Sequence, residues 1–178
     1  MADWLIEIDL RILNGIQNTF RCGFLDWFMP QFTSLGEKGW IYIVSALILF
    51  AIPMWRKWGI SLAVALLFGL IFGNVMIKNI VGRIRPYDRI GHFELLIDPL
   101  SDYSFPSGHT MAAFEFFVVV CMMPIKVRYK IIIGIGSVLM AFSRLYLYVH
   151  FPSDVLAGAL LGSLFGFLGV KLTQMVSQ

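Results

Sequence analysis

Residues 106–120 read PSGHTMAAFEFFVVV, and they place a polar tetrapeptide directly before an apolar run. Pro, Ser and Gly are typical of a turn or of the start of a helix, and Ser107 could serve simply as the cap. The free N–H groups and the positive dipole at a helix start also bind phosphate, and Gly108 would let the backbone approach an anion closely. The stretch therefore predicts a membrane helix whose first turn can hold an anion beside His109.

The whole chain has the composition of a membrane protein. Of its 178 residues, 58% are hydrophobic and 14% are charged, whereas typical soluble domains are about half apolar and about one quarter charged. The apolar residues also form long runs that a soluble domain of this length could not bury. We therefore expect one all-α integral membrane domain over residues 1–178, with an interfacial N-terminal segment at 1–37 and a helical bundle at 38–174.

A membrane-spanning helix needs about 20 mostly apolar residues. Five runs qualify, at roughly 39–55, 58–80, 109–124, 130–149 and 154–174. Between Asp3 and Phe20, apolar residues recur at helical spacing with Glu7, Asp9 and Arg11 between them, which is typical of an amphipathic helix on the interface. The sequence thus predicts five spans and a surface helix, and a bundle of six spans is the alternative.

The Lys and Arg residues of short loops indicate the orientation, because cytoplasmic loops carry an excess of them. One topology puts three basic groups in the cytoplasm and leaves the loop 83–108 and the turn around His150 outside. That outer loop is itself basic, which suggests that its arginines serve another purpose. The net charge is +3, but no basic stripe indicates nucleic-acid binding. The cytoplasmic groups are Arg56 and Lys57, then Lys126, Arg128 and Lys130, then Lys171, and the outer arginines are Arg83, Arg85 and Arg89.

Charged residues inside spans are costly and tend to be functional. Lys78 lies near the outer end of the second run, and Arg85 follows seven residues later. Seven residues are close to two helical turns, so both side chains can fall on one face. Pro86 disfavours a helical Arg85, so the helix should end about there. A pair of interfacial side chains that reach toward water is the simpler alternative.

The last two runs carry a second polar set. Ser143 and Arg144 lie within the outer half of the fourth run, where an arginine needs an anionic partner or a polar cavity. His150 precedes the fifth run and Asp154 falls in its first turn, where a carboxylate is favoured. The carboxylate could fix the tautomer of the imidazole and raise the basicity of its other nitrogen, although a structural capping pair is the alternative.

Under the proposed topology all of these residues meet at the outer face. Several cations beside a helix start describe a site that stabilises a phosphoryl group. A histidine oriented by an aspartate describes a nucleophile, and a second histidine describes a general acid. No cluster of carboxylates would hold Mg²⁺ or Ca²⁺, so Lys and Arg would neutralise the phosphate charge and no metal is expected.

These residues also carry a resemblance to a known family. Lys78 with Arg85 and Pro86 fits K-x6-R-P, residues 106–109 fit PSGH, and residues 143–154 fit S-R-x5-H-x3-D. With three motifs in order and correctly spaced over roughly 38–172, the sequence resembles the type 2 phosphatidic acid phosphatase family, which shares its site with vanadium haloperoxidases. The membrane members of that family usually have six spans.

The resemblance implies a metal-independent phosphatase that acts on lipid phosphates in a bilayer and needs no cofactor. It implies that His150 attacks phosphorus and forms a phosphohistidine, that Asp154 orients His150, and that His109 protonates the leaving oxygen. It implies that the phosphate oxygens are held by Lys78, Arg85, Ser107, the Gly108 amide and Arg144.

The compact size resembles bacterial undecaprenyl-diphosphate phosphatases and phosphatidylglycerophosphate phosphatases. We expect hydrolysis of undecaprenyl diphosphate to undecaprenyl phosphate, at the extracytoplasmic face of a bacterial plasma membrane. A phosphatidylglycerophosphate or phosphatidic acid phosphatase and a lipid phosphotransferase are alternatives. A vanadate-dependent peroxidase fits less well, because those relatives are soluble, and a non-enzymatic lipid carrier fits least.

Further polar residues fall outside the motifs, and Glu94, Asp98 and Asp102 in the outer loop could shape headgroup choice or simply be solvated. We expect Glu115, alone in the third run, to have a structural role because an isolated charge there is costly. Arg83 and Arg89 could bind the second phosphate of a diphosphate, and His92 matches no motif.

Overall fold

The structure is a computed structural model that describes residues 3–91 and 93–176, and over these residues it contains helices and no strand. The N-terminal helices are α1 (Asp3–Phe20), α2 (Gly23–Ser34) and α3 (Trp40–Ala51), with a 3₁₀ turn, η1 (Glu37–Gly39), before α3. After a second 3₁₀ turn, η2 (Pro53–Trp55), the chain forms α4 (Arg56–Phe68), the π-helix η3 (Gly69–Ile77), α5 (Lys78–Val81) and α6 (Pro86–Ile90). The last three helices are α7 (Gly108–Met122), α8 (Val127–Tyr146) and α9 (Pro152–Val176).

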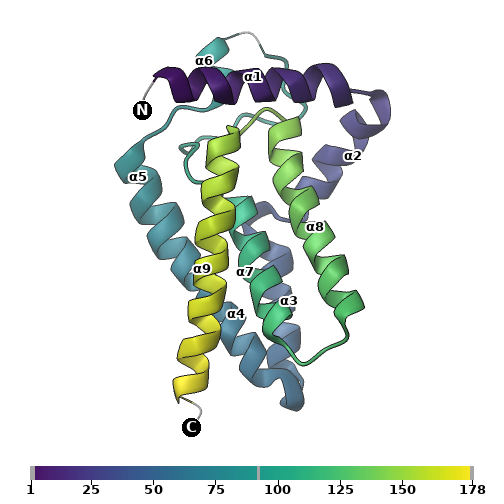
Figure 1. The fold of residues 1–178 in the computed structure, drawn as a ribbon, viewed down its shortest axis with the longest axis vertical. Helices are drawn as coiled ribbons and strands as arrows, with labels where there is room; N and C mark the ends of the chain where they lie inside the picture. Colours follow the sequence, from purple (N-terminus) through teal and green to yellow (C-terminus); the bar gives the residue numbers. More distant parts are fainter. Residues whose placement is uncertain (1–2, 92, 177–178) are drawn as a thin grey trace.

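The helices form an upright bundle with one helix lying across its end (Figure 1). Helix α7 packs between α9 and α8, and α4 packs against α9 and α3. Helix α1 crosses the end at which α6 and the α8–α9 connection also lie, which we call the α1 end (Figure 1). The α3–α4 and α7–α8 connections and the end of α9 lie at the opposite end, so the three basic groups predicted to share one side do so.

All five predicted runs are helical, but they differ in length. By length and composition, three helical segments of the described chain can cross a membrane, namely Pro53–Ile90, Val127–Tyr146 and Pro152–Val176. A fourth span results if α2 and the segment Glu37–Ala51, which are bent by 40° relative to each other, count as one span. Helix α7 is apolar but has only 15 residues, fewer than the roughly 20 that cross a bilayer. The all-α membrane bundle is therefore confirmed, and the count of five spans is not.

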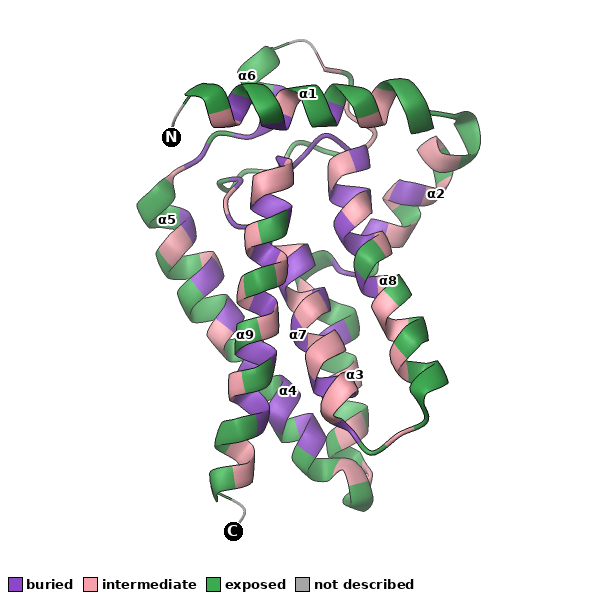
Figure 2. Ribbon diagram, in the orientation of Figure 1, coloured by how far each residue is buried: buried purple, intermediate pink, exposed green. Residues whose placement is uncertain are grey.

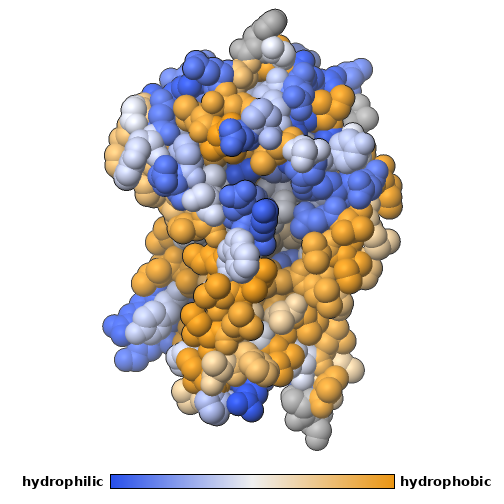
Figure 3. Space-filling view, turned by 180° about the vertical axis from the view of Figure 1, so that it is seen from behind, coloured by the Kyte–Doolittle hydropathy of each residue, from blue (hydrophilic) through white to orange (hydrophobic). Residues whose placement is uncertain are grey.

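The surface of the bundle is divided into a polar end and an apolar body. Buried residues line the inner faces of the helices, and the outer faces of α3, α8 and α9 are largely exposed (Figure 2). Those exposed faces carry large apolar side chains such as Leu47, Ile135 and Leu160. Figure 3 shows apolar side chains over the body of the molecule and polar ones gathered toward the α1 end. Side chains of this kind suit lipid rather than water.

Glycines let α9 rest directly on the backbone of α7. A β-carbon built on Gly158, Gly162 or Gly166 would lie 2.6, 2.2 and 2.8 Å from the carbonyl oxygens of Ser107, Met111 and Glu115, respectively. These distances are far below van der Waals contact, so only glycine fits. This close packing places the start of α9 beside the PSGH segment.

The helix that carries Lys78 ends earlier than the sequence suggests. It stops at Val81, because Gly82 adopts a left-handed conformation with φ of 58°. Arg85 is extended, and Pro86 occupies the first turn of α6, as proline favours. The expectation that Lys78 and Arg85 share a helix face is thus wrong. The left-handed Gly82 and the extended Arg85, and not helical periodicity, bring both side chains to Asp102.

Helix α1 corrects a second expectation. It is one unbroken helix on the surface, as predicted, but its buried residues are Ile6, Asp9 and Leu13. Trp4, Ile8 and Ile12 are exposed on its outer side. The sequence pattern grouped Asp9 with the polar residues of this helix, whereas only 2% of Asp9 is exposed. A carboxylate therefore faces the bundle, where it needs partners.

Candidate active site

A cavity of about 700 Å³ opens beneath the α1 end. One part of it is polar and brings together residues of all three motifs. The other part is apolar and is lined by α3, by α4 and by the start of η3, through residues such as Leu47, Leu66 and Leu70. The motif residues that line the polar part are Lys78, Arg85, Gly108, His109, Arg144 and His150.

His150 lies in the turn before α9, with its two ring nitrogens in different surroundings. Nε2 is 3.3 Å from Nη1 of Arg85. A guanidinium only donates hydrogen bonds, so Nε2 must accept and the ring proton belongs on Nδ1. Nδ1 points toward Asp154, whose Oδ2 is 3.7 Å away. The imidazole therefore presents an unprotonated nitrogen to the cations of the cavity and its N–H to a carboxylate.

Ser104 stands between His150 and Asp154. Its hydroxyl donates a hydrogen bond to Oδ2 of Asp154 and lies 3.4 Å from Nδ1 of His150. The Phe151 amide donates to the same carboxylate oxygen at 2.9 Å. At 3.7 Å the direct contact between the imidazole and Asp154 is longer than a hydrogen bond, as catalytic pairs often are before substrate binds.

Burial and positive neighbours keep His150 neutral. Only 2% of the residue is exposed. Burial lowers the pKa of His150 well below its usual value, and the charges of Arg85, Arg144 and Lys78 lower it further. A neutral imidazole has a free lone pair on Nε2, which a nucleophile requires.

Asp102 is hydrogen-bonded to two of the predicted phosphate ligands, Lys78 and Arg85. Its carboxylate accepts hydrogen bonds from Lys78 and, at 2.6 Å, from Nη2 of Arg85. Burial alone would raise the pKa of Asp102, but Lys78 and Arg85 outweigh burial and lower that pKa to about 2. The Asp102 side chain is 53% exposed, whereas those of Lys78 and Arg85 are 8% and 3% exposed. A carboxylate at the mouth of the cavity thus pairs with two buried cations and balances one of their two charges.

Arg144 is buried with part of its guanidinium unpaired. Its Nη1 donates to Thr33 Oγ1 at 2.5 Å, and the residue is 1% exposed. Its Nε and Nη2 are buried and have no hydrogen-bond partner among the described residues. Buried N–H donors without an acceptor are costly unless a ligand accepts their hydrogen bonds. Because Arg144 lines the cavity with His150, the unpaired nitrogens indicate a place for an anion.

The PSGH segment contributes in different ways along its length. Gly108 and His109 line the cavity, and a β-carbon on Gly108 would lie 2.7 Å from Oδ1 of Asn74. Ser107 is fully buried, its hydroxyl lies 3.0 Å from Thr110 Oγ1, and its N–H donates to the Asp154 carbonyl at 3.1 Å. The structure therefore brings Gly108 and His109 to the cavity but not the Ser107 hydroxyl.

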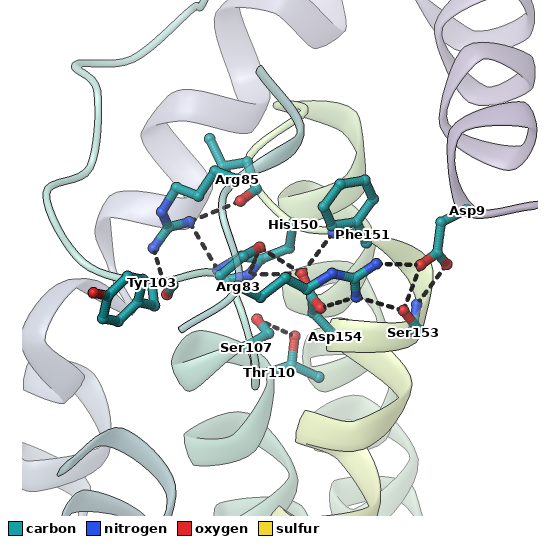
Figure 4. A network of polar contacts seen from close by, with 12 residues as sticks. Asp9, Arg83, Arg85, Tyr103, Ser107, Thr110, His150, Phe151, Ser153 and Asp154 are labelled. Carbon is teal, nitrogen blue, oxygen red and sulfur yellow. Dashed lines mark hydrogen bonds and ion pairs between the residues drawn. The ribbon is translucent and has the colours of Figure 1, made fainter. Parts of the chain in front are cut away.

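Arg83 lies apart from the predicted phosphate ligands. Its guanidinium donates to Asp154 and, at 2.7 Å, to Asp9, on the side of Asp154 away from His150 (Figure 4). The described part of the cavity lining does not include it, and Arg89 is exposed outside that lining. The structure therefore does not bring these two arginines to the cavity, and their contact with a second phosphate stays a prediction.

Sequence reasoning missed two residues of the site, Ser104 and Thr33, which belong to no motif. Ser104 comes to the site through the outer loop, as Asp102 does, and Thr33 comes from helix α2. Glu115 is buried against Gly69 and lines the cavity, with Oε1 unpaired among the described residues, and its structural role stays a prediction. His92 lies outside the described residues.

Comparisons with known proteins agree with this geometry. The sequence profile of the PAP2 superfamily matches residues 58–178. An undecaprenyl-diphosphatase from Sulfolobus acidocaldarius is 35% identical over 137 residues, which cover 76% of this chain and 64% of that protein, less than two thirds of its length. Phosphatidylglycerophosphatase B from Bacillus subtilis is 34% identical over 81% of this chain and 73% of its own length.

A solved structure supports the same assignment. The crystal structure of Aquifex aeolicus LpxE superposes with a TM-score of 0.82 at 30% identity, and the match covers 92% of this chain and 95% of that one. The resemblance drawn from the three motifs is therefore confirmed. The chain belongs to the PAP2 superfamily and is a multi-pass membrane protein.

Proposed function

We propose that this protein hydrolyses a lipid diphosphate, undecaprenyl diphosphate, to the lipid monophosphate through a phosphohistidine on His150. The observation that carries the proposal is the pair of unpaired, buried nitrogens of Arg144 in the cavity that holds Nε2 of His150. An anion with several oxygens, such as a terminal phosphate, would accept hydrogen bonds from those nitrogens and lie within reach of the imidazole.

The proposed reaction runs in two steps. The Nε2 lone pair of His150 forms a bond to the terminal phosphorus, and the bond from phosphorus to the bridging oxygen breaks. His109 donates a proton to the departing lipid phosphate, and Asp154 stabilises the positive charge on the imidazole. Water, losing a proton to His109, then attacks phosphorus, the N–P bond breaks, and inorganic phosphate leaves.

The phosphate oxygens are proposed to bind Lys78, Arg85, Arg144 and the start of α7. Asp102 now holds the first two of these cations, so the substrate would displace its carboxylate. Phosphoryl transfer depends mainly on positioning and on charge stabilisation. Three fixed cations supply that stabilisation, and we therefore propose that the reaction needs no metal ion.

The apolar part of the cavity favours a lipid with one long chain. Ala46, Leu47, Ala63 and Leu67 line the cavity and also line a separate apolar groove of about 410 Å³ between α3 and α4. The two spaces thus adjoin and form one path from the phosphate site toward the outside of the bundle. A single polyprenyl chain would fill such a path, and two acyl chains would have to share it.

We also propose that the α1 end faces the extracytoplasmic side of a bacterial plasma membrane. The basic connections at the opposite end support this orientation, because cytoplasmic loops are rich in Lys and Arg. A carrier lipid diphosphate released outside the cytoplasm would then meet the site directly.

Phosphate release from purified protein tests the proposal. The full chain in detergent is given undecaprenyl diphosphate, phosphatidylglycerol phosphate or phosphatidic acid, with excess EDTA. We expect EDTA-resistant release that is fastest with undecaprenyl diphosphate. His150→Ala should lose activity by about 10⁴-fold or more while remaining monodisperse, and Arg89→Gln, an exposed arginine outside the cavity, should not change it.

Each other outcome contradicts a different part of the proposal. Activity in a folded His150→Ala protein would refute the nucleophile. Loss of activity with EDTA would refute the metal-free reaction. A faster reaction with phosphatidylglycerol phosphate would refute undecaprenyl diphosphate as the preferred substrate. Transfer of phosphate to another lipid, without release of free phosphate, would show that the reaction is phosphotransfer and not hydrolysis.

A further inference from the structure

A buried carboxylate on the surface helix links α1 to the active site. The Asp9 side chain is 3% exposed, although its helix lies on the outside of the bundle. Its Oδ2 accepts hydrogen bonds from Nη2 of Arg83 at 2.7 Å and from the Ser153 hydroxyl, and its Oδ1 accepts from the Ser153 N–H at 3.0 Å. Burying a carboxylate is costly unless such partners compensate for the lost water.

Arg83 connects this carboxylate to the one behind the nucleophile. While Nη2 donates to Asp9, Nη1 donates to Asp154 and, at 2.7 Å, to the Ser153 hydroxyl. The guanidinium also lies 3.9 Å from the centre of the Phe151 ring. Figure 4 shows Arg83 between the two carboxylates, with His150 on the far side of Asp154. Side chains on both sides therefore fix Arg83.

Asp9 also holds the helix on which Asp154 stands. Ser153 is the second residue of α9, and its N–H is one of the free donors at a helix start. By accepting that hydrogen bond, Asp9 acts as a cap supplied by another helix, and a negative charge there is favoured by the helix dipole. One carboxylate thus fixes both the first turn of α9 and the cation that binds Asp154.

We propose that Asp9 is a positioning residue of the reaction, which through Arg83 and Ser153 keeps Asp154 oriented and negatively charged toward His150. The inference rests on the proposed function. It gives α1, which precedes the 58–178 region matched by the family profile, an indirect part in the chemistry through Arg83 and Ser153.

The charges of the three groups explain why Asp9 matters to the reaction. Asp9, Arg83 and Asp154 together carry two negative charges and one positive charge. The excess negative charge lies beside His150, whose ring becomes positive when it attacks phosphorus. Without the charge of Asp9, Arg83 would be balanced by Asp154 alone, and Asp154 would stabilise the charged imidazole less well.

Helix α1 supplies a matched control. Glu7 lies two residues before Asp9 and is also a carboxylate, but its side chain is 65% exposed and pairs with the exposed Arg11. The experiment compares Asp9→Asn, Glu7→Gln and Asp9→Glu in the full chain in detergent. Single-turnover phosphate release from undecaprenyl diphosphate is measured with enzyme in excess, and KM is measured in steady state. With active enzyme in excess, the single-turnover rate constant does not depend on the fraction of misfolded protein.

We expect Asp9→Asn to lower the single-turnover rate constant by roughly 10-fold to 100-fold, as misplacement of a catalytic group does. KM should change by less than about two-fold, because Asp9 lies behind Asp154 and does not line the cavity. Asp9→Glu restores the charge and should recover most of the rate. Glu7→Gln should match the wild type.

Other results overturn the inference. A normal rate constant in Asp9→Asn, even with a lower unfolding temperature, would show that Asp9 only stabilises the fold. An equal loss in Asp9→Glu would show that the charge is irrelevant. If Asp9→Asn does not fold, Ser153→Ala removes one contact of Asp9 and should slow the reaction by about 3-fold to 10-fold, and a normal rate would refute the proposal. Inactive wild-type protein would contradict the proposed function instead.

Discussion

Replacing Gly162 by alanine tests how closely α9 must approach α7. The new β-carbon would lie 2.2 Å from the Met111 carbonyl oxygen, whereas ordinary contact begins at 3.4 Å. The obstacle is helix backbone, which cannot rotate away as a side chain can. The two helices must therefore separate by about 1 Å, and overpacking of this kind costs about 1–3 kcal/mol.

That separation should affect both stability and activity. For a chain of this size, 1–3 kcal/mol corresponds to a fall in Tm of about 3–10 °C. Helix α7 carries His109 and α9 carries Asp154, so a shift of about 1 Å between them should lower kcat by about 10-fold to 100-fold. Thermal unfolding in detergent and phosphate release measure the two effects.

A second glycine provides the control. Gly136 lies in α8, and a β-carbon there would meet no atom within 4 Å. Gly136→Ala should leave the rate unchanged and raise the stability by about 0.5–1 kcal/mol, because alanine favours a helix more than glycine does. If Gly162→Ala kept the Tm and kcat of the wild type, the contact between α7 and α9 would be looser than described.

Two further predictions concern charge at the site. Asp102→Asn frees the two cations that its half-exposed carboxylate holds, so inorganic phosphate should inhibit the enzyme about 5-fold more strongly, which corresponds to the ~1 kcal/mol of such an ion pair. Asp98→Asn in the same loop is the control. Weaker inhibition by phosphate in Asp102→Asn would show instead that Asp102 organises the cations. Because burial and nearby cations lower the pKa of His150, the folded ring stays neutral while the unfolded ring binds a proton below about pH 6.5. Stability should therefore fall as the pH falls from about 7.5 to about 5.5, and the fall in Tm should be smaller in His150→Gln. Asp102, with a pKa of about 2, stays ionised over this range, and an equal fall in Tm in both proteins would refute the assignment to His150.

The motif residues could be predicted because their chemistry depends on short spacings. His150 and Asp154 are four residues apart at a helix start, so local geometry alone brings the imidazole near the carboxylate. PSGH could be placed at the beginning of a helix for the same reason. The apolar runs likewise predicted helices, because long apolar runs are typical of helices in a nonpolar environment.

The remaining residues of the site depend on tertiary structure. The pattern of α1 could not show that Asp9 faces inward, because apolar residues occur on both sides of that helix, and only packing on the bundle decides which side is buried. Asp102 and Ser104 reach the site through a loop with no periodic pattern. Thr33 meets Arg144 from 111 residues away along the chain, a distance over which sequence spacing carries no geometric information.

The π-helix between Gly69 and Ile77 has a consequence for how this sequence can change in length. Its turns hold more residues than those of an α-helix, so the direction of Lys78, which follows directly, depends on the wider winding before it. Removing one residue from this segment and tightening its winding to that of an α-helix would largely preserve that direction, because fewer residues then complete nearly the same rotation. The same deletion in α4, which has no extra residue to lose, would rotate Lys78, a proposed phosphate ligand, away from the cavity, so η3 is the place in this helix where the chain can shorten without disturbing the site.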